Sequence, residues 1–444
     1  MSGLRGLLKR FKRYADRPAL IEADGRVVTF TELVESVDAV RERLAEAGVA
    51  AGDVIALKAD YDSASIANLL AALGHGAIVA LLPVASEADT ELLELCQASH
   101  LVEGEQIAAL QGTKGEPHPQ LETLRQTSTP GLVIFTSGTS GKPKAVLHDA
   151  ERFLARFEDA SKAHTTIGFL LFDHIAGLDT ACYTLAAGGT LVALKDRRAT
   201  TVREAIASTS AEVLPASPSF LRLLCLDEDA ASDLQSLRTI TYGSEPMDEA
   251  TLERLEAMLP DAKLIQKFGT SEFGVVPART KPDDKRFIEL DERKVGIRIE
   301  DGMLHVRAPT AMIGYLGEET PSVVDGWIAT GDSVEQDGQW IRIIGRQSEL
   351  INVGGEKVYP AEIEDVIREL DEVREVIVRG DPHPLLGKVI AARIRTVEGA
   401  DTAAVRKAVR KHCSARLARY KVPVTIELTQ DALTGERQKL LRRS

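Results

Sequence analysis

The chain contains few cysteines and no excess of positive charge, and each absence excludes a class of protein. Its four cysteines form no Cys-x-x-Cys pair; they are Cys96, Cys182, Cys225 and Cys413. This number and spacing exclude a disulfide framework and a zinc ribbon, and they fit a reducing cytoplasm. The 54 Lys+Arg stand against 67 Asp+Glu, a formal net charge of −13, which argues against a dedicated nucleic-acid-binding protein. We therefore expect a cytoplasmic protein with no nucleic-acid partner.

The sequence also lacks a long uninterrupted apolar run. Residues 65–85 are uncharged, but Gly74-His75-Gly76 interrupt them, so we expect a buried helix at 66–73 and a buried strand at 77–82. The basic N-terminus, residues 1–13, is not followed by the apolar stretch or cleavage site of a secretory signal. It predicts a helix packed on the domain surface, with a short membrane-surface helix as the alternative. We expect no membrane partner.

Length and patterning indicate an α/β protein of more than one domain. At about 150 residues per domain, 444 residues suggest two or three domains. Helical spacing alternates with short apolar runs, which is typical of α/β layers with largely parallel sheets. The predicted helices are 33–44, 152–160 and 247–259, and the predicted strands are 53–57, 132–135, 168–172, 190–193 and 263–266. After Gly302 the pattern changes to short strands at 303–307, 327–329 and 340–344.

A second shift of composition follows Gly345-Arg346. The segment 401–444 carries eleven Lys/Arg and four Asp/Glu, whereas the rest of the chain is acidic. An acidic body with a basic C-terminal part suggests a small second domain.

The densest chemical signal is the segment 135–144, which reads FTSGTSGKPK. It follows a buried-strand pattern and combines glycines, hydroxyls and lysines. Glycines let backbone N–H groups approach phosphate oxygens, hydroxyls add donors, and lysines neutralise negative charge. A Walker A loop would have glycine and Ser/Thr where this chain has Thr136 and Pro143. The segment therefore predicts a phosphate-binding loop outside the P-loop class.

Further motifs follow this loop in order along the chain. They are Thr241-Tyr-Gly-Ser-Glu-Pro-Met247, Gln266-Lys-Phe-Gly-Thr-Ser-Glu272, Gly326-Trp-Ile-Ala-Thr-Gly-Asp332, Asn352-Val-Gly-Gly-Glu-Lys-Val-Tyr-Pro360 and Tyr420-Lys-Val-Pro423. Together they resemble the adenylate-forming superfamily, which includes acyl- and aryl-CoA ligases, adenylation domains and luciferases, over nearly the whole chain. The resemblance implies an α/β fold with a large N-terminal domain, residues 1–345, of layered, mostly parallel sheets with helices and a small distorted β-barrel. It also implies a small, mobile α+β C-terminal domain, residues 346–444, after a hinge near 346–349.

The resemblance assigns an ATP site to these motifs. Glu272 supplies a carboxylate for Mg²⁺, a cation that prefers oxygen ligands. Asp332 can accept hydrogen bonds from the ribose hydroxyls, and Arg346 offers fixed donors beside it. The expected ATP-binding residues are Thr136, Ser137, Gly138, Thr139, Ser140, Gly141, Lys144, Gly243, Ser244, Glu245, Pro246, Phe268, Gly269, Thr270, Ser271, Asp332, Ile344 and Arg346.

Lys439 matches the catalytic lysine of the family, whose charge stabilises the α-phosphoryl transition state. Its separation from Pro423 is the one that the family has, although Gln438 replaces the usual glycine. The resemblance implies three catalytic residues, Lys439, Glu272 and His174.

The acyl side of the expected site follows from Phe172-Asp-His-Ile-Ala-Gly177, where His174 matches the gating histidine of the family. In that alignment Ile175 takes the place of the Asp that holds an amino-acid substrate, so an α-amino acid is not expected. If Asp173 took that place instead, an amino acid would be. The expected acyl-pocket residues are His174, Gly177, Tyr242, Gly243, Lys267 and Gly269.

Lys267 stands at an acyl-pocket position that is usually small or apolar in the family. A buried lysine needs a partner, so we hypothesise that the substrate carries a second anionic or strongly polar group. The alternative is a side chain that reaches solvent or pairs with a protein carboxylate.

The implied reaction is the ATP-dependent activation of a small carboxylic acid as acyl-AMP, with release of pyrophosphate and transfer of the acyl group to a thiol. Gly354 and Gly355 would let a phosphopantetheine arm pass close to the backbone, so the acceptor is coenzyme A or, alternatively, a carrier-protein phosphopantetheine. Ser348 departs from the Asp or Lys that the family hinge usually has. A third reading is a degenerate nucleotide-binding protein.

Overall fold

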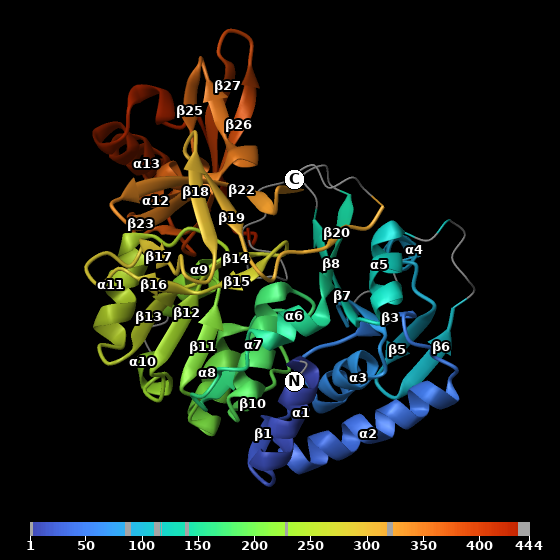
Figure 1. Cartoon of the computed structure of the whole chain (residues 1–444). Coiled ribbons are helices and arrows are strands. Elements are labelled where there is room, and N and C mark those ends of the chain that lie inside the picture. The colour runs from blue at the N-terminus through green and yellow to red at the C-terminus, as the bar shows by residue number, and fades with distance from the viewer. Residues whose placement is uncertain are drawn as a thin grey trace.

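Two seven-stranded sheets form the larger part of the molecule (Figure 1). The computed structural model describes residues 3–84, 90–110, 116, 118–137, 142–226, 230–317 and 323–433. The first sheet is parallel except at β2, and its strands run in the order β13 (Lys263–Gln266), β12 (Thr239–Tyr242), β11 (Val213–Ala216), β9 (Thr165–Ile167), β10 (Thr190–Val192), β1 (Pro18–Ile21) and β2 (Val27–Thr29). The second sheet has a parallel centre and antiparallel edges, in the order β20 (Gly314–Tyr315), β8 (Pro143–Asp149), β7 (Gly131–Ser137), β4 (Ile78–Leu82), β3 (Val54–Lys58), β5 (His100–Glu103) and β6 (Gln106–Ala109).

Alternating strand residues bury both faces of each large sheet under helices. On β3, Val54 and Ala56 belong to one core, and Ile55 and Leu57 belong to the other, as the period of two in a strand requires. The core between the sheets is filled by α1 (Gly3–Tyr14), α2 (Phe30–Glu46), α3 (Ser63–Gly74), α6 (Ala150–Ala155) and α7 (Ile175–Ala186). The outer helices are α4 (Thr90–Cys96) and α5 (Pro119–Thr127) on the second sheet, and α8 (Ala199–Thr209), α9 (Pro218–Cys225), α10 (Ala230–Asp233) and α11 (Glu249–Met258) on the first.

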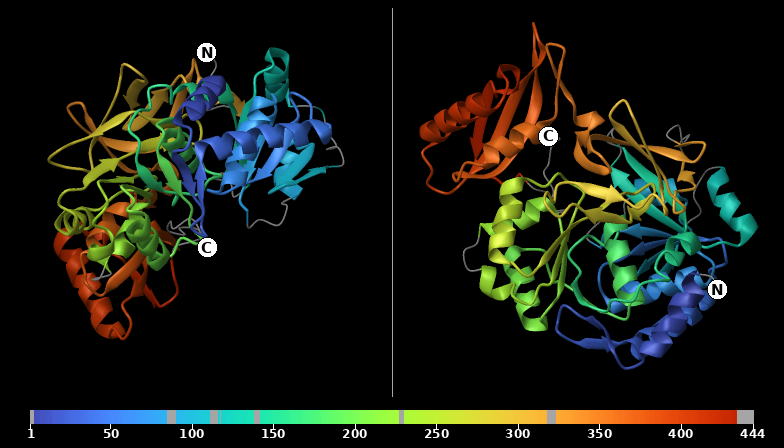
Figure 2. Two further views of the ribbon diagram at one scale, coloured as in Figure 1. Left: turned by 90° about the horizontal axis from the view of Figure 1, so that it is seen from below. Right: turned by 60° about the vertical axis from the view of Figure 1, so that its left-hand side comes forward.

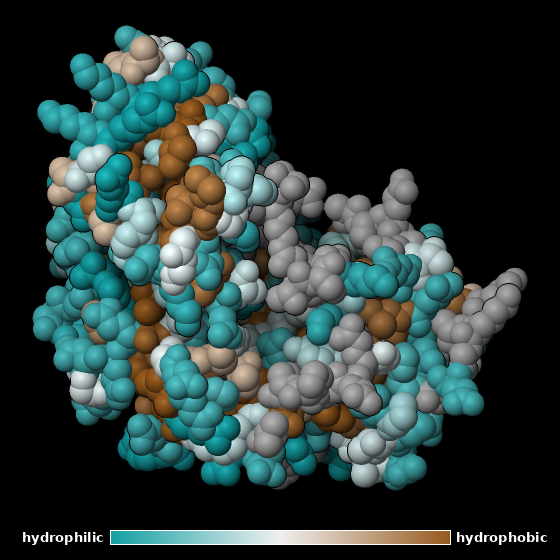
Figure 3. Space-filling view, turned by 90° about the horizontal axis from the view of Figure 1, so that it is seen from above, coloured by the Kyte–Doolittle hydropathy of each residue, from teal (hydrophilic) through white to brown (hydrophobic). Residues whose placement is uncertain are grey.

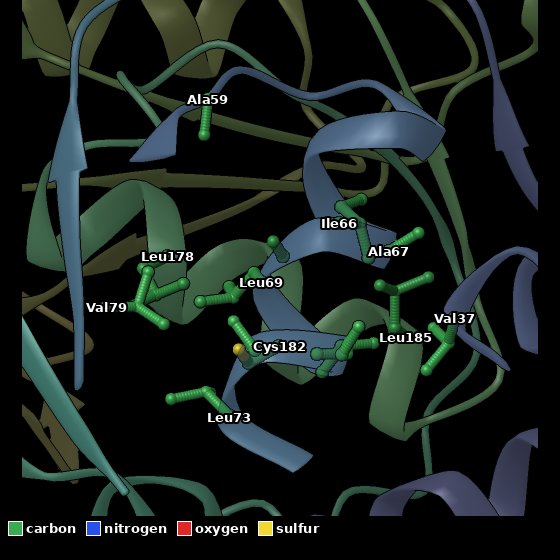
Figure 4. Packing of buried hydrophobic residues seen from close by; sticks show 14 of the residues in the cluster. Val37, Ala59, Ile66, Ala67, Leu69, Leu73, Val79, Leu178, Cys182 and Leu185 are labelled. Atoms are coloured by element: carbon green, nitrogen blue, oxygen red, sulfur yellow. The ribbon is translucent and has the colours of Figure 1, made fainter. Parts of the chain in front are cut away.

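Helices α3 and α7 meet in the layer between the sheets, where Leu69 and Leu73 of α3 lie near Leu178 and Cys182 of α7 (Figure 4). This contact fixes α7, whose N-terminus opens onto the site described below.

Local polar residues determine where two inner helices begin. At the start of α2, the Thr29 hydroxyl accepts a hydrogen bond from the Glu32 N–H at 3.2 Å, and the Glu32 carboxylate accepts one from the Thr29 N–H at 2.7 Å. This reciprocal pair is a capping box. The Asp62 carboxylate accepts a hydrogen bond from the Ser65 N–H at 2.7 Å and caps α3.

The basic N-terminus forms α1, as predicted, and packs its apolar face on the core. Leu4, Leu7 and Phe11 are buried there. Within the described part of the chain, no helix combines the length and the apolar character needed to cross a membrane.

A third, antiparallel sheet forms the curled half-barrel that the resemblance predicted as a small distorted barrel. Its strands run in the order β16 (Ala278–Thr280), β17 (Ile288–Leu290), β23 (Trp340–Arg346), β22 (Trp327–Asp337), β19 (Met303–Arg307) and β18 (Gly296–Glu300), with β21 (Val323–Val324) paired to β22. A two-stranded ribbon precedes it, formed by β14 (Phe268–Thr270) and β15 (Gly274–Val276).

The small C-terminal α+β domain stands above the other sheets (Figure 1) and has its own core. Its sheet runs in the order β25 (Glu356–Val358), β24 (Ile351–Val353), β27 (Gly387–Thr396) and β26 (Val373–His383), with β28 (Thr425–Thr429) parallel to β27. The remaining elements are α12 (Pro360–Arg368), α13 (Thr402–Arg416) and the 3₁₀ turns η1 (Gln347–Glu349) and η2 (Arg419–Lys421). Figure 2 shows this domain on one side of the molecule in two further views.

The predicted fold class is confirmed, and two predicted elements are wrong. The helix predicted to reach residue 160 ends at Ala155, and the strand predicted at 168–172 lies earlier, as β9. A Cβ at Gly168 would lie 2.5 Å from the Tyr61 ring, and from this glycine the chain leaves the sheet toward α7. The boundary predicted between residues 345 and 346 falls in the last residues of β23, and η1 occupies the predicted hinge; both stay predictions.

Candidate active site

A cavity of about 130 Å³ lies where parallel strands of the first sheet end. Its wall includes the segment after β9, the last residues of β11 and β12, and the residues after β13. Ligands of open α/β sheets bind at these carboxyl ends. Most of the wall is apolar and is formed by residues such as Phe169, Ile175, Ala216, Tyr242, Phe268 and Val275. Seen from above, the surface of the molecule is hollowed beside the C-terminal domain (Figure 3).

Two glycines let the strand ends approach closely enough to form this wall. A Cβ at Gly243 would lie 2.5 Å from the Lys267 carbonyl oxygen, and a Cβ at Gly269 would lie 2.4 Å from the Gly274 carbonyl oxygen. Neither distance can accommodate a side chain. The next residue, Ser244, is exposed and has a φ of +69°, which turns the loop after β12 away from the sheet.

The predicted phosphate loop connects β7 to β8, and its two ends are described. Thr136 lies opposite Lys144 in the antiparallel pairing, and the Lys144 ammonium lies 4.6 Å from the centre of the Tyr315 ring. The Tyr315 hydroxyl in turn donates a hydrogen bond of 2.8 Å to the Glu272 carboxylate. Ser137 is the last residue of β7, and the predicted residues Gly138, Thr139, Ser140 and Gly141 lie outside the described part.

Tyr315 is a site residue that the sequence motifs did not reveal. It belongs to the two-residue strand β20 and is placed by antiparallel pairing with Val146 of β8. The only available signal was the pair Gly314-Tyr315 after the half-barrel strands, which has no distinctive spacing. Its ring and hydroxyl connect the predicted phosphate-binding lysine with the predicted magnesium ligand.

The segment Phe268–Glu272 runs along the ribbon between the cavity and this cluster. Thr270 is buried, and its hydroxyl accepts a hydrogen bond from the Glu272 N–H at 3.2 Å. The Ser271 carbonyl oxygen accepts one from the His148 ring at 2.7 Å. Burial lowers the pKa of His148, so its ring is a neutral donor that holds the segment in place.

Two of the expected ATP-binding residues, Glu245 and Pro246, lie in the loop that follows β12. The Glu245 carboxylate accepts hydrogen bonds from the Ser219 N–H at 3.2 Å and from the Ser219 hydroxyl at 2.7 Å, which ties this loop to the start of α9. Pro246 follows and is half-buried.

Asp332 and Arg346 face each other on β22 and β23, as the predicted ribose site requires. Arg346 Nε lies 3.4 Å from Asp332 Oδ1, and Ile344 precedes this pair on β23. Burial raises the pKa of Asp332 to about 6, against the opposing effect of Arg346. Hydrogen-bond donors of a ligand stabilise a buried carboxylate more than an exposed one, because the buried carboxylate has lost most of its hydrogen bonds to water.

His174 lies at the N-terminus of α7 and lines the cavity, as predicted. Gly177 allows the close turn behind it, since a Cβ there would lie 2.0 Å from the Leu171 carbonyl oxygen. The Tyr61 hydroxyl also donates a 2.9 Å hydrogen bond to the Gly177 carbonyl oxygen. Asp173 is buried but is not among the residues that line the cavity. The geometry therefore agrees with the alignment on His174 rather than on Asp173.

The sequence motifs did not identify one carboxylate in the cavity wall. Asp179 follows Ile175 by one helical turn and lines the cavity. Arg156 Nη2 lies 2.6 Å from Asp179 Oδ1, and burial raises the pKa of Asp179 although Arg156 and Lys267 oppose this effect. The helical spacing from His174 was visible in the sequence, but nothing in it identified Arg156 as the partner.

Lys267 lines the cavity, but it is exposed rather than buried. The premise that burial forces it to find a partner is therefore wrong. Its backbone N–H donates a 2.7 Å hydrogen bond to the Tyr242 carbonyl oxygen, which fixes where the side chain begins.

One predicted feature lies away from the cavity, and another lies outside the described residues. Gly354 and Gly355, with φ of +60° and +97°, form the turn between β24 and β25, which points away from the large sheets (Figure 1). Lys439 lies outside the described residues.

The apolar cavity shares four residues with the ATP site that the resemblance predicts: Gly243, Ser244, Phe268 and Gly269. The chain belongs to the AMP-binding enzyme family, whose pattern matches residues 7–316. The pattern of the AMP-binding enzyme C-terminal domain matches residues 362–438.

Two curated relatives and one solved structure illustrate the similarity. The chain is 27% identical to 2-succinylbenzoate–CoA ligase of Listeria monocytogenes serotype 4b (strain F2365), over 95% of each chain. It is 28% identical to the fatty acid–[acyl-carrier-protein] ligase ScoC of Streptomyces coeruleorubidus, over 96% of this chain and 92% of the relative. The crystal structure of the anthranilate CoA ligase AuaEII in complex with anthranoyl-AMP shares the fold, with a TM-score of 0.83, 19% identity, and coverage of 100% and 96%. The chain is thus an AMP-forming acid–thiol ligase.

Proposed function

We propose that this enzyme activates a small carboxylic acid as its acyl adenylate and then transfers the acyl group to coenzyme A. One observation carries the proposal: Phe268 and Gly269 line the apolar cavity on β14, which leads directly to Glu272, and Gly243 lines it just after the end of β12. A carboxyl group at the open end of the cavity would therefore meet the α-phosphate of a nucleotide bound along these strands.

The size of the cavity favours a short acid. An engineered protein cavity of about 150 Å³ holds benzene, so about 130 Å³ accommodates one ring or a short chain. A long-chain fatty acid would need the wall to move.

The residues beside the nucleotide fit a magnesium ion shared with phosphates. Mg²⁺ is commonly bound by one or two protein carboxylates, with phosphate oxygens and water completing the shell. Among the described residues there is no cluster of three potential ligands, so Glu272 would serve as a single protein ligand. The Tyr315 hydroxyl already donates to this carboxylate and orients it. When bound, the ion supplies positive charge to the phosphates.

The protein contributes positioning and charge to the first step. An oxygen of the substrate carboxylate attacks the α-phosphorus, the bond to the β-phosphate oxygen breaks, and pyrophosphate leaves. Lys144 and the loop 136–144 hold the outer phosphates, Asp332 and Arg346 hold the ribose, and Lys439 offsets the charge that develops on the α-phosphoryl group. His174, at the start of α7, closes the cavity over the acyl group.

The second step requires the C-terminal domain to turn. In the present arrangement Gly354 and Gly355 lie away from the cavity, so a thiol arm guided by them would reach the adenylate only after rotation about residues 346–349. The hydrogen bond of 2.7 Å between the Tyr359 and Ser333 hydroxyls joins the two parts and would have to break. Exposed basic residues on α13 would meet the phosphates of coenzyme A; they are Arg406, Lys407, Arg410 and Lys411.

A carrier-protein phosphopantetheine is the second candidate acceptor. It is favoured by the relative that is named as an acyl-carrier-protein ligase, and the same basic surface of α13 would suit an acidic carrier.

Acid-dependent pyrophosphate release tests the proposal. Short aromatic and aliphatic acids should release pyrophosphate from ATP, and coenzyme A should accelerate the release. Acceleration only by a carrier protein bearing phosphopantetheine would favour the second acceptor. Glu272→Gln should lower kcat at least about 100-fold, as loss of a group that stabilises charge does, whereas Glu253→Gln on the exposed face of α11 should not. Equal activity of both variants would contradict the proposed site.

A further inference from the structure

The charged side chains around the cavity have a net positive charge. Asp179 is paired with Arg156 at 2.6 Å, and Arg197 is paired with Asp60 at 2.8 Å. Arg197 Nε also donates to the Phe169 carbonyl oxygen at 2.6 Å, so this guanidinium is fixed in the wall. Each of these two pairs is formally neutral.

Lys267 is the remaining cation of the wall. Within the described part of the chain, its ammonium makes no hydrogen bond or ion pair with a protein group. The side chain begins beside Gly243, where a Cβ built on the glycine would lie 3.6 Å from the Lys267 Cβ. Its charge opposes the rise in the pKa of Asp179, so the ammonium lies near enough to the cavity wall to influence its carboxylate. The cavity therefore carries one positive charge that no described protein group neutralises.

We infer that Lys267 binds a second carboxylate of the substrate, so that the enzyme activates small dicarboxylic acids. This inference rests on the proposed function, because one carboxylate must occupy the open end of the cavity at the nucleotide. The apolar wall then contacts the spacer between the two carboxylates, and the size of the cavity limits that spacer to about one ring or a chain of a few carbons. An exposed lysine at the rim can reach a carboxylate without the cost of burying an unpaired ammonium.

Arg197 is not the ligand of the second carboxylate, because its guanidinium already donates to Asp60 and to the Phe169 carbonyl oxygen. Asp179, the acidic group of the wall, is paired with Arg156 rather than with Lys267.

The test compares each diacid with its own half-ester, which has the same spacer and one negative charge fewer. The full-length enzyme is assayed for pyrophosphate release with glutarate and monomethyl glutarate, and with phthalate and monomethyl phthalate. A charge-assisted hydrogen bond to the second carboxylate predicts that the wild type prefers one of the diacids by at least about tenfold in kcat/KM. Lys267→Met should remove this preference by raising KM for the diacid, with the half-ester and the KM for ATP unchanged. Lys267→Arg should retain it.

Lys263→Met is the matched control, because Lys263 is an exposed lysine on the same strand, β13, and does not line the cavity. It should leave the preference intact. A Lys267→Met enzyme that still prefers the diacid overturns the inference, as does a wild type that uses benzoate and butyrate as well as the diacids. In both cases the proposed function stands, because acids are still activated. If ATP binds but none of these acids releases pyrophosphate, the proposed function and the inference both fail.

Discussion

We expect ATP binding to depend on pH near neutrality, because the pKa of Asp332 in the proposed ribose site is raised. Burial raises this pKa to about 6, so the carboxylate form is lost as the pH falls through 6. The ionised fraction is about 0.97 at pH 7.5 and about 0.24 at pH 5.5. If only the carboxylate accepts both ribose hydroxyls, the Kd for ATP should rise about fourfold over this range. The range stays above the isoelectric point of about 5.3, where the protein would lose its net charge.

Calorimetric titration of ATP, without acid substrate, measures this Kd on the free enzyme. The terminal phosphate of ATP takes up a proton near pH 6, as other phosphate monoesters do, so part of any pH effect belongs to the nucleotide. Asp332→Asn removes the titrating carboxylate and shares the nucleotide effect, so it should bind ATP more weakly but with a flatter pH profile. Asp337→Asn, at the far end of the same strand, should keep the wild-type profile.

Parallel profiles for the wild type and Asp332→Asn would refute the reasoning. They would mean that Asp332 keeps the same charge throughout this range, or that it does not contact the nucleotide.

Three further changes test the site and its framework. Tyr315→Phe removes the hydroxyl that donates to Glu272, so the Mg²⁺ concentration needed for half-maximal pyrophosphate release should rise about tenfold, and an unchanged requirement would contradict this role. Gly269→Ala places a Cβ 2.4 Å from the first carbonyl oxygen of β15, so urea denaturation should show a loss of about 1–3 kcal/mol, and wild-type stability would show that the ribbon can yield. Asp248→Asn leaves Arg222 buried without its 2.8 Å ion pair, so the free energy of unfolding should fall by about 3 kcal/mol, and a shift below about 1 kcal/mol would indicate that water replaces the carboxylate.

The regular elements could be predicted because their signals are local. The strand at 263–266 and the helix covering 33–44 follow from apolar spacing, and the capping box at Thr29 fixes where that helix begins. The strand predicted at 168–172 failed because the apolar run there lines a cavity wall instead of a sheet. An apolar pattern indicates burial, but it does not indicate which surface covers the residue.

The site was predictable only where a motif carried it. Glu272, Asp332 and Lys144 stand in dense motifs, so the resemblance could assign roles to them, but residues that contact them in the structure come from other parts of the sequence. Tyr315 donates a hydrogen bond to Glu272, although 43 positions separate them in the sequence. Asp179 is paired with Arg156, which lies just after α6 and not on α7. The exposure of Lys267 could not be predicted either, since no local pattern distinguishes a lysine at the rim of a cavity from one inside it.

The pairing of β1 with β10 has a consequence for how the chain folds during synthesis. Leu20 lies opposite Leu191, so the strand made first must wait for a partner about 170 residues later. At the usual translation rate of about 5 to 20 residues per second, roughly 10 to 30 seconds pass before that partner strand leaves the ribosome. During this interval the edge of β1 that pairs with β10 has no native partner, and long-range pairings of this kind form slowly. The first sheet is therefore exposed to misfolding during synthesis until β10 completes it.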